Sequence, residues 1–465
     1  IENKEACDEV LKYLKANDYI VRTVEEKDKT RRPAPPYTTS SLQQDAANKL
    51  NFTTRKTMMV AQQLYEGLSI SGRGTVGLVS YIRTDSTRIS GEARGAARQF
   101  ILDNMGKEYY AGIVFSNKNK DVQDAHEAIR PSYVDITPES IKDQVSKDQY
   151  NLYRLIWQRF VASQMAPAKL KAIGADIRNG KYEFRATGSK VIFDGFLRVY
   201  PMSKNAEEDK WLPNLEVGEK LEEKEVRPSQ NFTQPPARFT EASLVKDLEE
   251  KGIGRPSTYA PIVATLSDRK YIKKSKKNLV PTKLGFTVTD MMCDYFKEIV
   301  DVDFTANMEK GLDDIEAKGV PWKKIIKDYY GILREELNRA DEEMAKLEPE
   351  LELTGEKCPE CGKDLVIKQG RFGSFIACMG YPECKYTKPI VKSIGVKCPK
   401  CGGDIIVRRG KRKSFYGCSN YPKCNEMYWD KPTGEFCPVC GSMLVEKKGK
   451  NSKVACSNKE CKYKA

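Results

Sequence analysis

The spacing of hydrophobic residues predicts a mostly helical block that lies between two stretches of β structure. Residues 3–17 carry one apolar side at helical spacing, and residues 19–25 alternate between polar and apolar as a strand does. Between residues 39 and 165 the apolar stripes predict helices over 40–50, 54–66, 91–105 and 147–165. A glycine-rich loop, 67–75, interrupts this block.

Residues 168–228 change to alternation with period two, which predicts antiparallel strands over 169–177, 182–187 and 191–201. Since strand-like segments lie on both sides of it, we expect the helical block to be inserted into a β domain. Residues 235–346 return to helical spacing, and within them 241–252 is typical of an amphipathic helix with Thr240 as its N-cap. The acidic stretch 348–355 predicts a linker.

Twelve of the 14 cysteines lie after residue 355 in three similar copies. The copies are Cys358, Cys361, Cys378 and Cys384; Cys398, Cys401, Cys418 and Cys424; and Cys437, Cys440, Cys456 and Cys461. Two facing pairs of thiolates supply the four ligands of tetrahedral zinc. A disulfide framework is the alternative, which a charged chain without a signal peptide disfavours. We therefore expect three zinc ribbons, and we expect Cys7 and Cys293 to be ordinary buried thiols.

The formal charge of +14 is concentrated in the tail. Residues 355–465 contain 23 Lys and Arg against 10 Asp and Glu, whereas the first 354 residues contain 56 against 55. A basic tail indicates a polyanionic partner. No apolar run is long enough to span a membrane, so we expect no membrane partner.

Residues 77–87 hold the most distinctive candidate chemistry. The apolar residues before Tyr81 predict a strand that delivers this tyrosine to a cluster of polar groups, with Arg83 beside it and residues 84–87 forming the turn that starts a helix. A phenol with a pKa near ~10 needs a cation close by to attack an anionic phosphate. On residue types alone, a core strand that ends in a capped helix with a surface arginine fits as well.

Seven segments match, in order, the motifs of type IA DNA topoisomerases. They are 41–46 (SLQQDA), 56–66 (KTMMVAQQLYE), 80–87 (SYIRTDST), 125–131 (AHEAIRP), 236–244 (PARFTEASL), 252–260 (GIGRPSTYA) and 303–309 (DFTANME). The chain therefore resembles this family from residue 41 to residue 309, and the resemblance implies β strands that arch around a hole, with a helical gate. Ile82 after the tyrosine and the three ribbons make it more similar to topoisomerase I than to topoisomerase III.

The resemblance implies a catalytic role for three residues. Tyr81 would attack a DNA phosphodiester and leave one strand joined through a 5′-phosphotyrosine, while Arg83 binds the scissile phosphate and His126 contacts a phosphate nearby. Religation needs no ATP, and the sequence has no GxxxxGK[ST] phosphate loop. By residue type alone His126 also fits a packed ring. Arg130 fits a structural ion pair as well as a DNA contact.

Further DNA contacts are expected in two regions. The loop 252–259 opens a helix, so its N–H groups with Arg255, Ser257 and Thr258 suit a phosphate, although a plain turn capped by Ser257 is the alternative. Arg238 is a similar candidate. In the first two ribbons, rings among basic residues suit stacking on unpaired bases, although some of them must fill the small cores. These rings are Phe372, Phe375, Tyr381, Phe415, Tyr416 and Tyr421.

One element of the family is missing from the 465 residues. The family's chemistry needs magnesium on an acidic motif, Asp-x-Asp-x-x-Gly, in a Toprim domain that precedes this region, and no such motif occurs here. The sequence also begins at Ile1 without an initiator methionine. We therefore expect a fragment that lacks the Toprim domain, binds single-stranded DNA and does not relax supercoils by itself.

The expected fold is a multidomain α+β protein with a helical gate domain inserted in a β arch domain, a further helical domain and three tandem zinc ribbons. The expected boundaries are 1–39 and 167–232 for the arch, 40–166 for the gate, 233–350 for the helical DNA-groove domain, and 356–390, 396–432 and 435–465 for the ribbons.

The expected function is ATP-independent relaxation of negatively supercoiled DNA by an isomerase that acts as a monomer in the bacterial cytoplasm, at the nucleoid. Expected cofactors are three zinc ions in the ribbons and magnesium in the Toprim domain. Expected partners are single-stranded and negatively supercoiled DNA, with RNA polymerase as a further candidate partner of the basic tail. The alternative is a non-catalytic zinc-ribbon protein that binds single-stranded nucleic acid.

Overall fold

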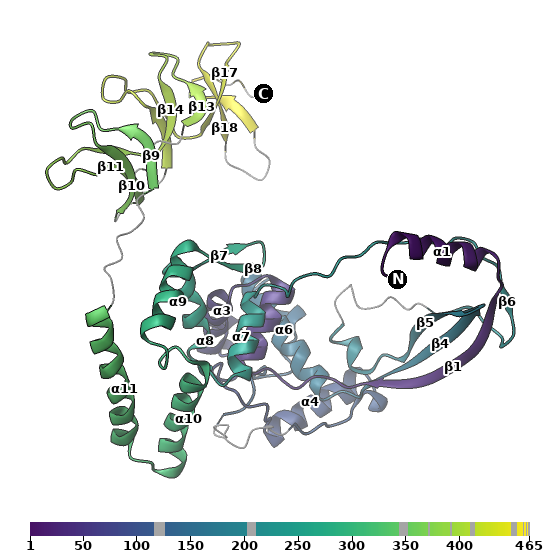
Figure 1. Ribbon diagram of the computed structural model, residues 1–465. Helices are drawn as coiled ribbons and strands as arrows, with labels where there is room; N and C mark the ends of the chain where they lie inside the picture. Colours follow the sequence, from purple (N-terminus) through teal and green to yellow (C-terminus); the bar gives the residue numbers. More distant parts are fainter. Residues whose placement is uncertain are drawn as a thin grey trace. The chain divides into compact units, whose positions relative to one another are not determined.

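The computed structural model divides the chain into two compact units, Ile1–Met344 and Ala345–Ala465 (Figure 1). The residues that it describes are 1–115, 126–201, 211–343, 352–370, 373–390, 393–409, 414–447, 453–458, 460–461 and 463. The predicted combination of helices with several sheets is confirmed. In the described part of the chain, no helix has the length and apolar character needed to cross a membrane.

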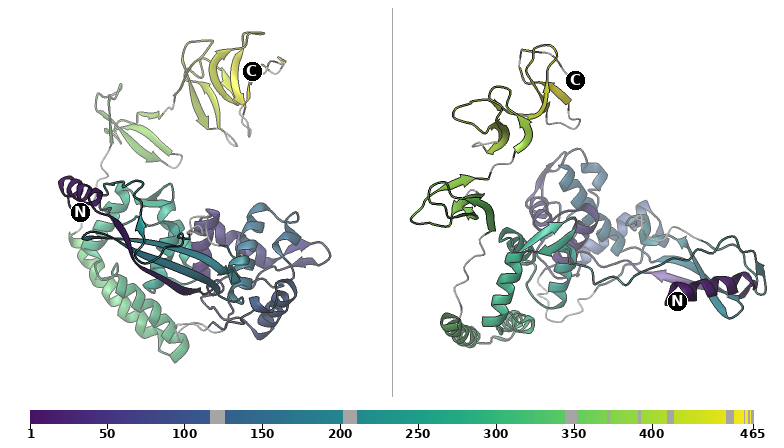
Figure 2. Two further views of the ribbon diagram at one scale, coloured as in Figure 1. Left: turned by 90° about the vertical axis from the view of Figure 1, so that its right-hand side faces the viewer. Right: turned by 45° about the horizontal axis from the view of Figure 1, so that its top comes forward.

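The arch is a four-stranded antiparallel sheet whose strands form a long curved ribbon that leads away from the helices of the first unit (Figures 1 and 2). Its order is β5-β4-β1-β6. Helix α1 precedes it, and the bounds are α1 Lys4–Lys15, β1 Tyr19–Arg31, β4 Ala168–Asn179, β5 Tyr182–Phe193 and β6 Lys220–Leu221.

Two strands of the arch differ in length from the predictions. Strand β1 continues past residue 25 through a charged, exposed half that pairs with β4 as far as Arg31 and Ala168, so backbone pairing rather than apolar alternation extends it. Strand β5 joins two of the predicted strands and ends at Phe193. A 3₁₀ turn, Gly195–Arg198, replaces the end of the strand predicted over 191–201.

The gate packs its helices around one apolar core that includes Leu42, Leu64, Ile101, Ile156 and Phe160. At four helix starts a hydroxyl accepts a backbone N–H bond of the first turn, which is why the predicted starts agree with the structure; these N-caps are Thr38, Thr53, Ser90 and Ser146. The elements are α2 Thr39–Asp45, a π-helix Ala46–Leu50, α3 Thr54–Glu66, β2 Leu68–Ile70, β3 Gly74–Val76, α4 Gly91–Asn104, a 3₁₀ turn Lys107–Tyr109, α5 Pro138–Ile141 and α6 Lys147–Ser163.

The segment around Tyr81 differs from the predicted strand and turn. The glycine-rich loop forms a hairpin of β2 with β3, and β3 ends at Val76. Beyond it the backbone forms no regular ladder and bends at Ser80, Ile82 and Arg83, and Val79 makes an isolated bridge to Pro131. The next helix begins at Gly91 behind the N-cap Ser90 rather than at residues 84–87, because the hydroxyls in that turn bond within the loop.

The groove domain, residues 233–343 of the described chain, has a small core around Val245, Tyr259 and Val263. Helix α7 packs on α2 of the gate, and α8 packs on α3. The elements are α7 Glu241–Glu250, α8 Tyr259–Asp268, the hairpin β7 Ile272–Ser275 with β8 Asn278–Pro281, α9 Lys283–Tyr295, α10 Val302–Lys318 and α11 Trp322–Glu343.

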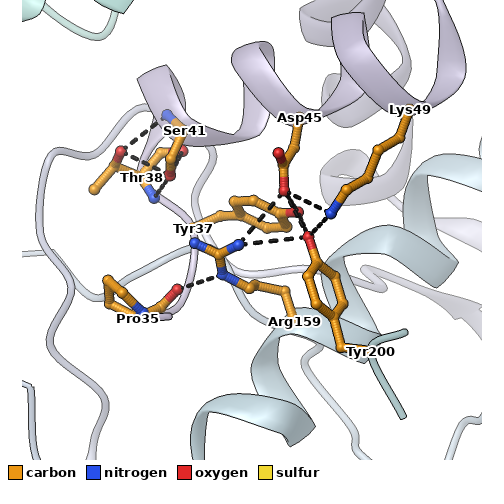
Figure 3. Close-up of polar contacts among 8 residues, drawn as sticks. All are labelled: Pro35, Tyr37, Thr38, Ser41, Asp45, Lys49, Arg159 and Tyr200. Atoms are coloured by element: carbon orange, nitrogen blue, oxygen red, sulfur yellow. Dashed lines mark hydrogen bonds and ion pairs between the residues drawn. The ribbon is translucent and has the colours of Figure 1, made fainter. Parts of the chain in front are cut away.

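A polar cluster around Asp45 joins the arch to the gate (Figure 3). Asp45 Oδ2 accepts hydrogen bonds from the hydroxyls of Tyr37 at 2.6 Å and Tyr200 at 2.5 Å, and from Lys49 Nζ at 3.1 Å. Arg159 Nη1 lies 3.4 Å from the same oxygen, and its guanidinium stacks over the Tyr37 ring. We call these five residues the Asp45 cluster. Since Tyr200 follows the arch strand β5 and the others belong to the gate or the segment that enters it, the cluster connects the two domains.

The second unit consists of three small antiparallel sheets, one for each predicted ribbon. Ribbon 1 has the order β12-β11-β10-β9, ribbon 2 has β13-β14-β15-β16 and ribbon 3 has β17-β18-β19. The bounds are β9 Glu352–Lys357, β10 Asp364–Gly370, β11 Gly373–Cys378, β12 Thr387–Pro389, β13 Ser393–Lys397, β14 Asp404–Arg409, β15 Ser414–Cys418, β16 Met427–Tyr428, β17 Lys431–Phe436, β18 Met443–Lys447 and β19 Lys453–Cys456.

Ribbons 2 and 3 share one apolar core. Met443 and Val445 of ribbon 3 are buried in the same cluster as Ile405 and Tyr428 of ribbon 2. In ribbons 1 and 2 the position of Met443 is an aspartate that pairs with a lysine across the sheet, as in the ion pair between Lys397 and Asp404. Replacing that charged position with methionine gives ribbon 3 an apolar surface, which explains why it packs on its neighbour.

Candidate active site

Tyr81 lies on an irregular segment, with bends at Ser80, Ile82 and Arg83, whose side chains alternate between solvent and core. Tyr81 is 37 % exposed, Ile82 is buried, Arg83 is exposed and Thr84 is buried. Thr39 fixes this alternation from α2: its hydroxyl is 2.7 Å from the Ile82 carbonyl oxygen, and it accepts the Thr84 N–H at 2.9 Å. The tyrosine and the arginine are therefore both exposed, while the residues that follow each of them are held in the core.

A second segment, 126–131, places His126 against Tyr81. The Ser80 N–H donates to the Arg130 carbonyl at 2.9 Å, and the Arg130 N–H donates to Ser80 Oγ at 2.9 Å. This pairing brings the His126 ring to 4.9 Å from the Tyr81 ring, centroid to centroid, while Tyr65 of α3 contacts the tyrosine at 5.6 Å. Tyr81 and His126, which are 45 positions apart in the sequence, thus meet at the surface of the gate.

Arg83 lines a cavity of about 540 Å³ between α3 of the gate and α8 of the groove domain. The α3 wall includes Met59, Gln62 and Glu66, and the opposite wall includes Ser257 at the start of α8. The cavity thus combines apolar walls with a guanidinium and a helix N-terminus, a combination that suits a phosphate together with part of a base or sugar.

Asp85 is a neighbour of this site that the sequence did not single out. Burial raises the pKa of its carboxyl, the charges of Arg255 and His126 partly counteract that, and Asp313 of α10 raises it further. An ionisable group that is half-buried near the proposed reacting groups is a candidate for a functional role. Its position inside the motif of residues 80–87 was the available signal.

The three cysteine quartets have the geometry that zinc requires. In each quartet the four sulfur atoms lie within 4.8 Å of one another. A tetrahedron with 2.3 Å zinc–sulfur bonds needs ~3.8 Å between sulfurs. The first and fourth cysteines of each quartet are 3.7 Å apart, and the second and third are slightly closer, at 3.2 Å in ribbon 1 and 3.3 Å in ribbons 2 and 3. The backbone N–H of Lys363 lowers the pKa of Cys361 to about 7, so this ligand ionises readily. The twelve predicted ligands therefore form three Cys₄ zinc sites.

Comparisons with known proteins agree with this geometry. A family model described as DNA topoisomerase matches residues 1–327, and a model described as topoisomerase DNA binding C4 zinc finger matches 355–393, 395–433 and 434–465. The chain belongs to the bacterial type IA DNA topoisomerases. The solved structure of full-length topoisomerase I from Thermotoga maritima is 37% identical with a TM-score of 0.64, and the match covers 82% of this chain and 61% of that one. The chain thus spans about three fifths of that topoisomerase.

The other basic candidates in this topoisomerase chain have different surroundings. Arg130 donates to Glu127 Oε2 at 2.7 Å, which is the structural ion pair that the sequence left open. Arg238 is exposed in the segment before α7. Arg255 donates to Asp313 Oδ2 of α10 at 2.6 Å, and the Thr258 hydroxyl accepts the Arg255 backbone N–H at 2.8 Å, so the guanidinium is bonded to another helix and the hydroxyl is bonded within the loop. Their contact with DNA stays a prediction.

The ribbon aromatics of the topoisomerase tail separate into exposed and packed rings. Tyr381 and Tyr421 are 64 % and 60 % exposed, and each lies beside a cation of its own ribbon, Lys368 at 5.6 Å and Arg408 at 5.2 Å from the ring centroid. Tyr416, by contrast, packs against the shared core.

Three further ring positions complete this comparison. Phe415 contacts Trp429 at 5.9 Å, an exposed ring that our sequence reasoning missed because it follows the last cysteine of ribbon 2. Phe375 lies opposite Lys368 across strands β10 and β11 of ribbon 1. Phe372 lies outside the described residues.

Proposed function

We propose that this chain contributes the gate, the arch and the DNA-binding tail of an enzyme that relaxes negatively supercoiled DNA by cutting and rejoining one strand. The observation that supports this most directly is an exposed Tyr81 with His126 in ring contact, two residues before the exposed Arg83. A buried tyrosine remote from both groups would have spoken against it.

In the proposed reaction Tyr81 Oη attacks the phosphorus of a phosphodiester in single-stranded DNA. The new bond joins the tyrosine to the 5′-phosphate, the bond from phosphorus to the neighbouring 3′ oxygen breaks, and the phenol proton ends on that oxygen. Arg83 offsets the negative charge that accumulates on the phosphate oxygens, and His126 binds a phosphate oxygen nearby. Since one phosphate ester replaces another, the reverse reaction reseals the strand without ATP.

In this proposal magnesium binds to the acidic motif of the family's Toprim domain and not to the residues of this chain. No Asp-x-Asp-x-x-Gly segment occurs in the 465 residues, and the match covers 61% of the Thermotoga enzyme. We therefore propose that this chain alone binds single-stranded DNA but does not relax supercoils.

The tail supplies the second half of the proposal. Exposed tyrosines beside Lys368 and Arg408 suit unpaired bases, with stacking and phosphate attraction combined. The same features support the alternative function, a non-catalytic protein that tethers single-stranded nucleic acid. In the favoured proposal the enzyme is a monomer located at the bacterial nucleoid, and RNA polymerase is a partner of its basic tail.

A covalent-adduct assay separates the two functions. Labelled single-stranded DNA is incubated with magnesium and the complete enzyme, which carries the acidic motif, and with its Tyr81→Phe variant, before denaturation with detergent. If the protein cleaves DNA through Tyr81, the first reaction gives a protein–DNA adduct and the second gives none. DNA binding by both proteins without any adduct would favour the tethering function. Supercoil relaxation by residues 1–465 alone would overturn the proposed dependence on the missing part.

A further inference from the structure

The contact between the gate and the groove domain, which we call the seam, lacks a shared apolar core. Among the described residues, the buried cluster of the gate ends at Val199, and the groove domain forms a separate cluster around Val245, Tyr259 and Val263. Between helices α3 and α8 lies the cavity that Arg83 lines. No apolar cluster of the described residues therefore extends across the seam.

Glu241 makes the most buried polar contact of the seam. Glu241 is the first residue of α7 and is 8 % exposed. Its carboxylate accepts a hydrogen bond, at 2.7 Å, from the backbone N–H of Thr54, the first residue of α3. The first-turn N–H groups of a helix have no partner within the helix, and its N-terminus carries partial positive charge. Lys274 of β7 lies 3.0 Å from the other carboxylate oxygen. One anion thus joins two helix starts and a lysine.

Two further contacts have the same polarity. The Ser40 hydroxyl of α2 donates to Glu249 Oε2 at 2.8 Å, and Arg55 of α3 lies 3.4 Å from Asp268 of α8. In all three contacts the groove domain supplies the carboxylate and the gate supplies the donor. Exposure weakens the Arg55–Asp268 pair, whose side chains are 70% and 61% exposed. Glu249 is also an exposed residue, although its bond is to the buried Ser40, so the buried Glu241 contributes most to the seam and Glu249 less.

The arch side of the gate is joined differently. Phe196 and Val199, which follow strand β5, are buried in the gate's own core, and the Asp45 cluster adds a network of hydrogen bonds and ion pairs on top of this packing (Figure 3). Separation at that junction would expose the apolar side chains of Phe196 and Val199 as well as the charge of Asp45. Separation at the seam would expose the Glu241 carboxylate but would not break a shared apolar cluster of the described residues. The seam is the weaker of the two junctions.

We infer that Glu241 and Glu249 are positioning residues that hold the gate closed, keep α3 against the catalytic cavity and release it along the seam. The reason why the gate would open rests on the proposed function. The contacts that hold the gate closed do not depend on DNA cleavage by Tyr81. Helix α3 carries Gln62 and Glu66 on the cavity wall, so the seam also fixes the wall that faces Arg83.

Hydrogen exchange of the DNA-free chain 1–465 tests the inference. Glu241→Gln and Glu249→Gln remove the charge and keep the shape, so the seam opens more often and the amides of residues 54–58 exchange about three- to tenfold faster. Amides of α6, in the core, keep their rates. Glu250→Gln is the matched control, because Glu250 lies on the same helix and, in the described part of the chain, forms its ion pair with the exposed Lys246.

Unchanged exchange at 54–58 in both variants would overturn the inference. Faster exchange throughout the gate, α6 included, would also overturn it, since it would assign Glu241 to general stability. Neither outcome depends on the covalent-adduct assay, so a failure of the seam inference and a failure of the proposed cleavage can be told apart.

Discussion

At the scale of single residues, Thr39 does most to present the proposed nucleophile. Its hydroxyl and N–H bond to the backbone on both sides of Arg83, and this keeps Ile82 and Thr84 in the core while Tyr81 faces solvent. Sequence reasoning located Tyr81 and Arg83 but not this support, because a threonine on another helix leaves no local signal in the motif.

Replacing Thr39 with valine therefore tests how Tyr81 is held. Thr39→Val keeps the shape but leaves the Ile82 carbonyl oxygen and the Thr84 N–H without their partner, which should cost about 2 kcal/mol of unfolding free energy. Urea unfolding measures this loss. In the complete enzyme, adduct formation should fall more than DNA binding. Thr75→Val, at an exposed position of the β3 hairpin, should change neither quantity.

The contribution of Asp45 to the stability of the fold should depend on pH, and the direction of its pKa shift gives the sign. Burial alone would raise the pKa of its carboxyl, but hydrogen bonds from Tyr200 and Tyr37 and the charge of Lys49 outweigh burial and lower it below its usual 3.8. A lowered pKa in the folded state means that the ionised carboxylate stabilises the fold above pH 3.8, and that this contribution is lost as the pH falls through the lowered value.

Asp45→Asn should accordingly lower the unfolding free energy by about 2 kcal/mol at pH 7, an amount that allows for the partial exposure of the carboxylate. The difference from the parent protein should stay constant down to about pH 5 and shrink below pH 4. Denaturant unfolding across this pH range measures it. Asp103→Asn on the exposed side of α4 serves as the control, and a difference that grows in acid would contradict the assigned sign.

At the scale of elements, the helix starts could be predicted from the sequence, whereas the extended segments could not. Thr38, Thr53 and Ser146 combine a capping side chain with an apolar stripe, and both signals are local. The charged half of β1 and the segment after Val76 depend on partners more than 40 residues away in sequence, such as Ala168 for Arg31 and Arg130 for Ser80. Alternation alone therefore missed the first and mistook the second for a strand.

The ribbons offer an element-level prediction. Because ribbons 2 and 3 share a core, Cys437→Ser should remove one of three bound zinc ions and also loosen strands β14 and β15 of ribbon 2. Cys358→Ser should remove one zinc ion and loosen ribbon 1 only, since its core is separate among the described residues. Zinc analysis with hydrogen exchange measures both. Unaltered β14 exchange in Cys437→Ser would contradict the shared core.

The exposed ring of ribbon 2 supports a prediction about binding. Tyr421→Ala removes a ring that is 60 % exposed beside Arg408, so the affinity for single-stranded DNA should fall about 5- to 100-fold, as expected for one stacked base. Tyr330→Ala, an equally exposed ring on α11, is the control. Equilibrium titration with a labelled oligonucleotide measures both, and equal losses would refute a special role for Tyr421.

At the scale of the whole molecule, the order of the domains along the chain could be predicted from the sequence better than the contacts of single residues. The change from helical spacing to period two and back predicted that the arch encloses the gate in the chain order, and the cysteine repeat predicted three ribbons. What the sequence could not predict were contacts between segments far apart in the chain: the carboxylates of the seam, the Asp45 cluster and the core that ribbons 2 and 3 share. Each depends on residues whose types are ordinary on their own.

The shared core of the last two ribbons has a mechanical consequence for DNA. Two modules with a common interior keep a constant spacing, so a strand that touches both must follow one fixed path between them. An oligonucleotide long enough to reach both should therefore gain affinity in a single step at one length, rather than gradually with each added nucleotide.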